Sequence, residues 1–143
     1  MIIRTWELAD VERINQIEQA SFSDPWSKDS LVGVTNASNF FGLVAEENSE
    51  VVGYIGASSV LDEGEILLVA VDKAFRCKGL GKMLVNGLLK AYSDNGVKKV
   101  FLEVRKSNAP AIACYEKCGF IKIAERARYY RDGEDAIIME ASL

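Results

Sequence analysis

A glycine-containing loop with three basic residues is the first segment whose residue types suggest chemistry. It runs over Arg76-Cys77-Lys78-Gly79-Leu80-Gly81-Lys82, between an apolar strand that ends in Val69-Ala70-Val71 and an amphipathic helix. Free N–H groups at a helix start carry partial positive charge, and glycine lets a bulky anion approach the backbone closely. An ordinary strand-to-helix turn with surface lysines has the same spacing, so the pattern alone leaves a phosphate site and a plain turn equally open.

Two common phosphate motifs do not fit this loop. A Walker loop requires glycine five residues before the Gly-Lys pair and Ser or Thr after it, but Arg76 and Met83 stand at those places around Gly81-Lys82. A dinucleotide fingerprint would need its third glycine at Leu84. The loop therefore belongs to neither class.

Glu103 and Tyr115 are the candidate proton-transfer groups. Glu103 lies near the end of a strand whose other members are mostly apolar, where a charge must be partnered or functional. From the residues alone, a glutamate paired with Arg105 or facing solvent outranks a catalytic one. Tyr115 could equally be a core aromatic on its helix. Both alternatives stay open at this level.

The absence of histidine limits the chemistry further. Any acid–base step must use Glu, Asp, Tyr, Lys or Cys. The three cysteines, Cys77, Cys114 and Cys118, show no Cys-x-x-Cys spacing, so neither a disulfide framework nor a zinc site is indicated, and we expect no metal. Because no histidine is present to activate a thiol, we expect the cysteines to be bystanders.

Hydrophobic periodicity and turn signals predict the elements that must hold these groups. Helices are expected over residues 9–22, from Ser27 through Val34, over 81–95, and from Asn108 to about Cys118. Strands are expected over residues 2–5, 40–46, 51–61, 65–71, 99–104, 120–129 and 135–140. The strand over 65–71 is apolar at consecutive positions, as in a central strand covered on both faces. The Asp132-Gly133 pair predicts a hairpin between the last two strands.

This alternation of hairpins and strand–helix–strand units predicts an α/β fold. We expect a mixed sheet with helices packed on its faces, in the order β-α-α-β-β-β-α-β-α-β-β. A length of 143 residues is about that of one ordinary domain, so we expect a single domain over residues 1–143.

Charge and hydropathy restrict the partners. The net charge of -4 argues against a general nucleic-acid binder, because nonspecific affinity for nucleic acid comes from a basic surface. The longest apolar runs fall far short of the ~20 residues of a membrane-spanning helix, and the N-terminus lacks a signal-peptide pattern. We therefore expect a cytoplasmic protein that binds neither nucleic acid nor membrane.

The Arg-x-x-Gly-x-Gly spacing resembles the pyrophosphate-binding motif of the GCN5-related N-acetyltransferase (GNAT) superfamily. The preceding strand, the following helix, Asn108 and the run from Ala113 to Phe120 look like other motifs of that family, so the resemblance covers nearly the whole chain. It implies the GNAT fold, with a central, mostly antiparallel sheet, and acetyl-CoA as cosubstrate. It places the cofactor contacts at Val69, Ala70, Val71, Arg76, Cys77, Lys78, Gly79, Leu80, Gly81, Lys82 and Asn108. Lys73 and Cys77 depart from the usual family residues, but neither removes a backbone donor.

A narrower resemblance concerns the acceptor. Leu102-Glu103-Val104-Arg105, the early Pro25-Trp26-Ser27 and the late segment from Tyr129 to Met139 look like the bacterial ribosomal-protein-alanine N-acetyltransferases. Members of that group acetylate the N-terminal alanine of a small-subunit ribosomal protein. The resemblance implies that Glu103 accepts a proton and that Tyr115 protonates the departing thiolate. Without a nucleophile triad, transfer should be direct, in a ternary complex.

The same resemblance implies that a protein N-terminus is the partner and that Trp26, Tyr129 and Tyr130 contact it. For the two tyrosines, the alternative is a β-prone packing pair. Glu134 and Asp135 would suit a basic protein tail by electrostatic attraction.

Three other functions could use the same residues. A broader protein N-terminal acetyltransferase shares the Tyr-Tyr and Asp-Gly-Glu-Asp-Ala features. A small-molecule amine acetyltransferase shares the fold and the donor loop. A non-enzymatic CoA-binding module would keep the loop but lack working chemistry.

Overall fold

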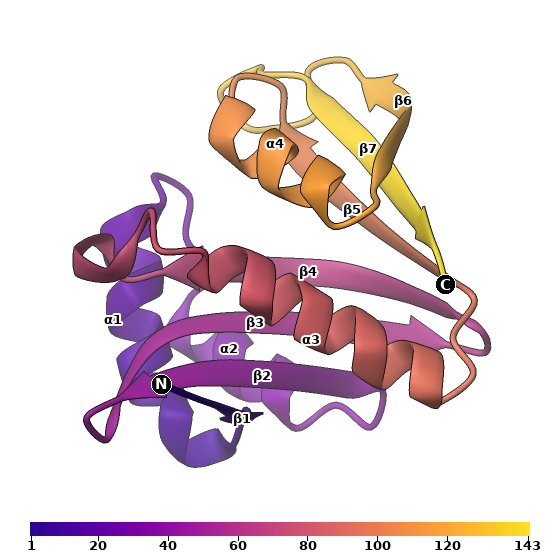
Figure 1. Cartoon of the computed structure of the whole chain (residues 1–143). Coiled ribbons are helices and arrows are strands. Elements are labelled where there is room, and N and C mark those ends of the chain that lie inside the picture. Colours follow the sequence, from indigo (N-terminus) through magenta and orange to yellow (C-terminus); the bar gives the residue numbers. More distant parts are fainter.

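The computed structural model describes all 143 residues and contains one seven-stranded sheet with helices on both faces (Figure 1). The strands are β1 (Ile2–Thr5), β2 (Phe40–Glu47), β3 (Glu50–Val60), β4 (Glu63–Val71), β5 (Lys99–Arg105), β6 (Ile121–Arg126) and β7 (Ala136–Ser142). The helices are α1 (Val11–Ser21), α2 (Lys28–Thr35), α3 (Leu80–Asp94) and α4 (Ala109–Lys117), with 3-10 turns η1 (Leu8–Asp10) and η2 (Lys73–Phe75). The predicted order of strands and α-helices is confirmed. No helix is both long enough and apolar enough to span a membrane.

The sheet opens between its fourth and fifth strands. Its order is β1-β2-β3-β4-β5-β7-β6, and every neighbouring pair is antiparallel except β4 and β5. These two strands pair only where Glu63–Glu65 lies against Lys99–Phe101, and beyond that point they diverge (Figure 1). Leu67 is the extra residue of a β-bulge in β4, just past the last pair with β5. A bulge bends the strand that carries it, so the bend falls at the start of the opening.

Two hydrophobic cores cover the two faces of the sheet. The cluster under α3 and α4 contains 21 buried residues, including Leu84 and Leu102. The cluster under α1 and α2 contains 10, including Trp6. Ile66 of β4 belongs to the first cluster and Leu68 to the second. The expectation that this strand is central and buried on both faces is confirmed.

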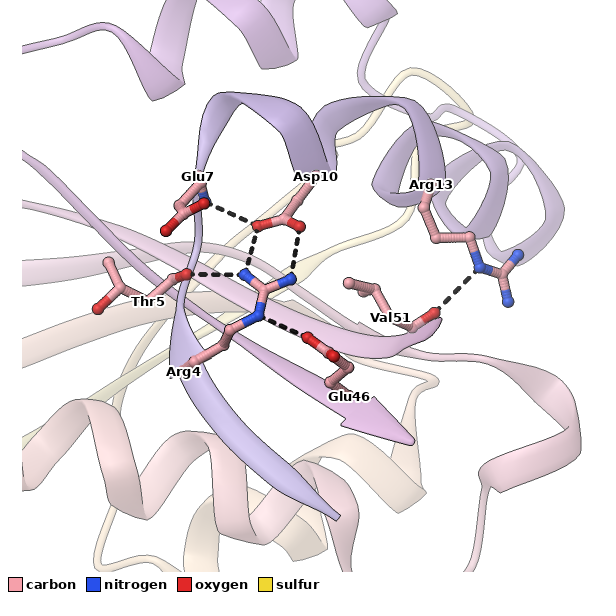
Figure 2. Close-up of polar contacts among 7 residues, drawn as sticks. All are labelled: Arg4, Thr5, Glu7, Asp10, Arg13, Glu46 and Val51. Atoms are coloured by element: carbon pink, nitrogen blue, oxygen red, sulfur yellow. Dashed lines mark hydrogen bonds and ion pairs between the residues drawn. The ribbon is translucent and has the colours of Figure 1, made fainter. Parts of the chain in front are cut away.

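At β1, the other edge of the sheet, ion pairs connect the edge strand to its neighbours. The Arg4 guanidinium donates to the two oxygens of Asp10 at 2.9 and 2.8 Å and to Glu46 at 2.6 Å (Figure 2). Asp10 is buried and also accepts from the Glu7 N–H at 2.8 Å. A buried carboxylate is tolerated only when it is paired and hydrogen-bonded, so Arg4 fixes η1 to the first two strands. Nearby, Arg13 of α1 donates to the Val51 carbonyl at 3.0 Å (Figure 2).

The predicted hairpin of the last two strands is confirmed, but the connection between β6 and β7 is longer than predicted. β6 ends at Arg126 and β7 begins at Ala136, so Tyr129 lies in a connection over residues 127–135 and not on a strand. The Asp-Gly turn forms inside this connection, where Gly133 has a φ of 85°. Asp135 lies just before β7: its carboxylate accepts from the Arg128 N–H at 3.0 Å, and its carbonyl accepts from the Lys106 N–H at 3.1 Å, next to the pair of Arg105 with Ala136.

Candidate active site

The backbone of β4 presents N–H groups to the opening. The Asp72 N–H donates to the Val52 carbonyl of β3 at 2.8 Å. Because N–H groups alternate in direction along a strand, Ala70 shares this direction, whereas Val69 and Val71 turn theirs to the side from which β5 has diverged. Two of the three predicted cofactor-contacting residues of β4 therefore offer donors to the opening, while the Ala70 side chain lies in the second core.

Side-chain contacts brace the loop after β4. The Asp72 carboxylate accepts from the Ala74 N–H at 2.9 Å. Arg76 donates from Nε to the Val71 carbonyl at 2.9 Å and from Nη2 to the Ser21 hydroxyl at 3.1 Å. Arg76 was predicted to contact the cofactor, and its guanidinium is engaged in tying the loop to β4 and α1.

The N-terminus of α3 has no side-chain cap. Gly79 is the N-cap with a φ of 79°, and the first turn contains no acidic residue. The Met83 N–H bonds to the Gly79 carbonyl at 3.1 Å, which leaves the N–H groups of residues 80–82 as the free donors of this helix start. Cys77 also has a left-handed φ, 63°, which is uncommon for a residue other than glycine. Three free donors beside the exposed Lys78 form an arrangement suited to an anion.

Side-chain caps are present at the starts of α2 and α4. The Ser27 hydroxyl accepts from the Ser30 N–H at 3.1 Å at the start of α2. Asn108, a predicted cofactor contact, accepts through Oδ1 from the Ala111 N–H at 3.3 Å at the start of α4. Its side-chain N–H groups are not used by this cap. The chain therefore caps α2 and α4 and leaves α3 open.

Glu103 lies on the face of β5 that is turned away from the main core. Leu102 and Val104 are both buried in the first cluster, so alternation places Glu103 on the other face, where its side chain is 24% exposed. Its Oε1 is 3.8 Å from Nη1 of Arg126 on β6. The partner suggested by the sequence, Arg105, pairs with other carboxylates.

A cavity of about 350 Å³ lies on this face, at the start of the opening. Glu65 of β4 is in register with Phe101 of β5 and supplies a second carboxylate next to Glu103. Burial and the charge of Glu103 raise the pKa of Glu65, and the charge of Arg126 opposes this. The lining holds more carboxylates than cations and therefore suits a cationic ligand. It consists of Ser58, Val60, Glu63, Gly64, Glu65, Phe101, Leu102, Glu103, Arg126 and Ile138.

Tyr115 reaches β5 from the opposite side. It is buried in the same cluster as Leu102, and its ring packs edge-on against Phe120 with centroids 5.8 Å apart. Burial, with smaller contributions from Cys114 and Tyr130, raises the pKa of Tyr115 above its ordinary range. A tyrosine that stays protonated can donate a proton or a hydrogen bond. The base candidate and the acid candidate thus lie on opposite faces of one strand.

Tyr129 and Tyr130 lie next to Glu103. Their rings pack edge-on with centroids 5.1 Å apart. The neighbouring Glu103 carboxylate, together with partial burial, raises the pKa of the Tyr129 hydroxyl. Tyr130 lies under Arg105, whose Cζ is 4.1 Å from the ring centroid. The structure therefore brings the predicted acceptor-binding tyrosines to the predicted base.

Arg105 has a positioning role that the sequence did not reveal. Its Nη1 donates to Asp132 at 2.9 Å and to Glu134 at 3.1 Å. The Ser107 N–H also donates to Glu134, at 2.8 Å. Glu134, which was expected to attract a basic acceptor tail, is held by Arg105 and by the Ser107 N–H and organises the loop that carries the tyrosines. The available signal was an arginine two residues after Glu103, on the same face of the strand, together with the acidic run at 132–135.

Trp26 is fixed by a buried carboxylate. Glu18 of α1 is 2% exposed and accepts from the backbone N–H of Trp26 at 3.0 Å and from the Tyr54 hydroxyl. In the same loop, Asp24 lies 3.8 Å from Arg131 of the β6–β7 connection. The two segments that carry the predicted acceptor-binding residues thus meet through this ion pair.

Relatives of known activity match nearly the whole chain. Residues 11–120 match the acetyltransferase (GNAT) family. The ribosomal protein bS18-alanine N-acetyltransferase of Salmonella typhimurium is 38% identical over 127 residues, which cover 87% of this chain and 85% of that protein. The crystal structure of the ribosomal-protein-S18-alanine N-acetyltransferase from Escherichia coli has a TM-score of 0.93 at 34% identity, covering 99% of this chain and 92% of that one. Ard1 from Thermoplasma volcanium has a TM-score of 0.91 at 30% identity, covering 99% and 97%.

Proposed function

We propose that this chain, which belongs to the acetyltransferase (GNAT) family, transfers the acetyl group of acetyl-CoA to the N-terminal alanine of ribosomal protein bS18. The observation that carries the proposal is the position of Glu103. Its carboxylate lies where β4 and β5 begin to diverge, with Tyr129 beside it. The relatives from Salmonella typhimurium and Escherichia coli are named for this activity, and this chain covers most of the length of each.

The donor side suits acetyl-CoA, which supplies an activated acetyl group and a thiolate leaving group. The free N–H groups of residues 80–82 and the charge of Lys78 suit a pyrophosphate. The N–H groups of Val69 and Val71 suit the carbonyl and amide groups of the pantetheine arm. The side-chain N–H groups of Asn108 are available for a further contact.

Glu103 accepts the proton of the acceptor's ammonium, directly or through one water. An α-amino group titrates near pH ~8 and a lysine side chain near ~10.4, so near neutrality a carboxylate produces a neutral α-amine far more readily than a neutral lysine. The site chemistry therefore favours a protein N-terminus over a lysine side chain as acceptor.

Tyr115 acts on the leaving group from the other side of β5. Because burial keeps its hydroxyl protonated, it donates a hydrogen bond to the developing thiolate and delivers the proton as the thiolate departs. The transfer is direct, because the chain has no histidine that could activate a cysteine for an acyl-enzyme step. Both substrates must then be bound together.

The acceptor side consists of Tyr129 and Tyr130 on one segment and Trp26 on the other. We assign them to the first residues of the acceptor, which lie along the cavity in front of Glu103. The bS18 acceptor implies a cytoplasmic site of action.

The test is an acetylation assay with labelled acetyl-CoA. Three acceptor peptides begin with Ala, Ser or Met, and the Ala-led peptide has the bS18 sequence. A lysine peptide with a blocked α-amino group and a polyamine are tested as well. We expect the bS18 peptide to be preferred. Comparable rates on all three N-termini would favour the broader N-terminal acetyltransferase, and acetylation of the polyamine alone would contradict the proposal.

A cellular measurement complements the assay. Mass spectrometry of ribosomal proteins from cells with and without this protein should show N-terminal acetylation of bS18 only where it is present. Cofactor binding without thiol release on any acceptor would instead identify a CoA-binding module.

A further inference from the structure

Arg126 places a cation where the acceptor's ammonium has to arrive. It is the last residue of β6, the edge strand, and its side chain is 60% exposed. Its Nη1 lies 3.8 Å from Oε1 of Glu103, and its Cζ lies 5.6 Å from the ring centroid of Tyr129. A carboxylate beside an aromatic face is also what recognises an alkylammonium ion. Arg126 therefore occupies the position of a substrate charge.

Arg126 is held much more loosely than Arg105, the other arginine of the site. Arg105 has carboxylates at 2.9 and 3.1 Å, a ring at 4.1 Å, and a side chain that is only 27% exposed. Arg126 has one carboxylate at the outer limit of an ion pair. Exposed pairs of this kind contribute about 0–1 kcal/mol. An arriving cation can therefore displace Arg126 from Glu103, whereas Arg105 stays in place.

The cavity gives Arg126 an alternative partner. Arg126, Glu103 and Glu65 line the same space of about 350 Å³. Glu65 forms no ion pair of its own, and the charge of Arg126 already acts on it. Because the Arg126 side chain is flexible and exposed, a small movement can shift its guanidinium from Glu103 to Glu65.

We propose that Arg126 is the internal counter-ion of Glu103 in the free enzyme, and that the acceptor's ammonium displaces it toward Glu65. This inference rests on the proposed function. Arg126 is then a positioning residue that competes with the charge of the acceptor, so it weakens the binding of a cationic N-terminus and has no such effect on an N-terminus without charge.

The experiment compares R126Q with R126K, which restores the charge, and with R128Q, which removes the same charge two residues away. Steady-state kinetics are measured with an Ala-led bS18 peptide, and inhibition with the same peptide N-acetylated. We expect R126Q to lower the KM for the peptide roughly 2–5-fold, the range of an exposed ion pair, and to leave the KM for acetyl-CoA unchanged. Inhibition by the acetylated peptide should not change, because that peptide lacks the ammonium.

R126K and R128Q should both keep the wild-type KM. A KM in R126Q that is unchanged or raised would overturn the proposal. So would an equal effect of R126Q on the binding of the charged peptide and of the acetylated peptide, because a merely structural loss acts on both.

A second measurement does not depend on turnover. In the CoA-bound wild-type protein, the NMR signal of the Arg126 Nε–H group should move when the Ala-led peptide is added and should not move with the acetylated peptide. In the free protein, R126Q should raise the pKa of Tyr129 further, because Arg126 opposes the effect of Glu103 on that hydroxyl. If turnover on every peptide fails while the arginine signal still responds, the proposed function is wrong and the counter-ion role stands. If turnover is normal and the arginine signal does not respond, the counter-ion role is wrong and the proposed function stands.

Discussion

The two sides of the sheet opening are built from different kinds of groups. The proposed donor side consists mainly of backbone N–H groups, at Val69 and Val71 of β4 and at residues 80–82 of α3. The acceptor side consists of side chains that hold one another through ion pairs and ring contacts, with Arg105 at their centre. Backbone donors suit the parts of the cofactor that never vary, whereas a side-chain network can be changed one residue at a time to suit another acceptor.

The largest effect should come from Glu103 and Tyr115, the two residues that we propose as proton acceptor and proton donor. Glu103→Gln and Tyr115→Phe should each lower kcat by roughly 10² to 10⁴-fold, the usual contribution of a general base or acid. The KM for acetyl-CoA should stay near its wild-type value, because the groups proposed to hold the pyrophosphate and the pantetheine arm lie elsewhere, on β4 and at the start of α3. Glu63→Gln, which removes a carboxylate from the same cavity, is the control and should leave kcat unchanged. Near-normal kcat in a folded Glu103 or Tyr115 variant would remove that residue from the mechanism.

A change at Gly79 tests whether the donor side depends on backbone conformation. Its φ of 79° is left-handed, and a side chain there meets no neighbour within 4 Å, so Gly79→Ala changes the backbone preference alone. The left-handed region costs an L-residue about 1–2 kcal/mol, which corresponds to a rise of roughly 5–30-fold in the KM for acetyl-CoA. The KM for the peptide should not change. Gly33→Ala, on α2 and also in open space, is the matched control.

Arg105→Gln should raise the KM for the peptide and leave the KM for acetyl-CoA unchanged, the reverse of the effect of Gly79→Ala. Without the guanidinium, the connection over residues 127–135 loses two carboxylate contacts and the support of the Tyr130 ring. Both carboxylates are accessible to solvent, which weakens these bonds, so we expect the KM for the peptide to rise only roughly 5-fold. Arg105→Lys should recover part of this loss, because lysine keeps the charge without the planar fork. An equal rise in the KM for acetyl-CoA would mean that the two sides are not separable.

The smallest effect should follow Asp24→Asn. This carboxylate pairs with Arg131 at 3.8 Å, and the two side chains are 50% and 88% exposed. At this exposure and distance such a pair lies near the bottom of the usual range of about 0–1 kcal/mol, so the KM for the peptide should change less than about 2-fold. A larger change, measured against Lys90→Gln in the exposed Lys90–Asp94 pair, would show that the contact between the two acceptor loops matters to binding.

The difference between the two sides also decides what could be predicted from the sequence. The donor side can be predicted from local patterns. An apolar central strand, glycines at a helix start and the absence of a capping residue all follow one another along a short segment of the chain. The position of Glu103 beside Tyr129 depends on how β5, β7 and β6 pair, and only the resemblance to a family linked the two. The role of Arg105 was missed because its partners are 27 and 29 positions away. The hairpin of β6 and β7 was predicted correctly, but its connection was predicted too short, because an Asp-Gly turn inside a longer loop has the same local signature as a tight hairpin turn.

The brief contact between β4 and β5 has a thermodynamic consequence. Within the sheet, only the pairs of Glu63–Glu65 with Lys99–Phe101 join the first four strands to the last three. A ligand that occupies the opening touches both halves and acts as a reversible clamp between them. At a free concentration one hundred times its Kd, such a ligand adds about 2.7 kcal/mol to the free energy of unfolding. The supply of acetyl-CoA in the cell would then govern how long this enzyme survives as well as how fast it works.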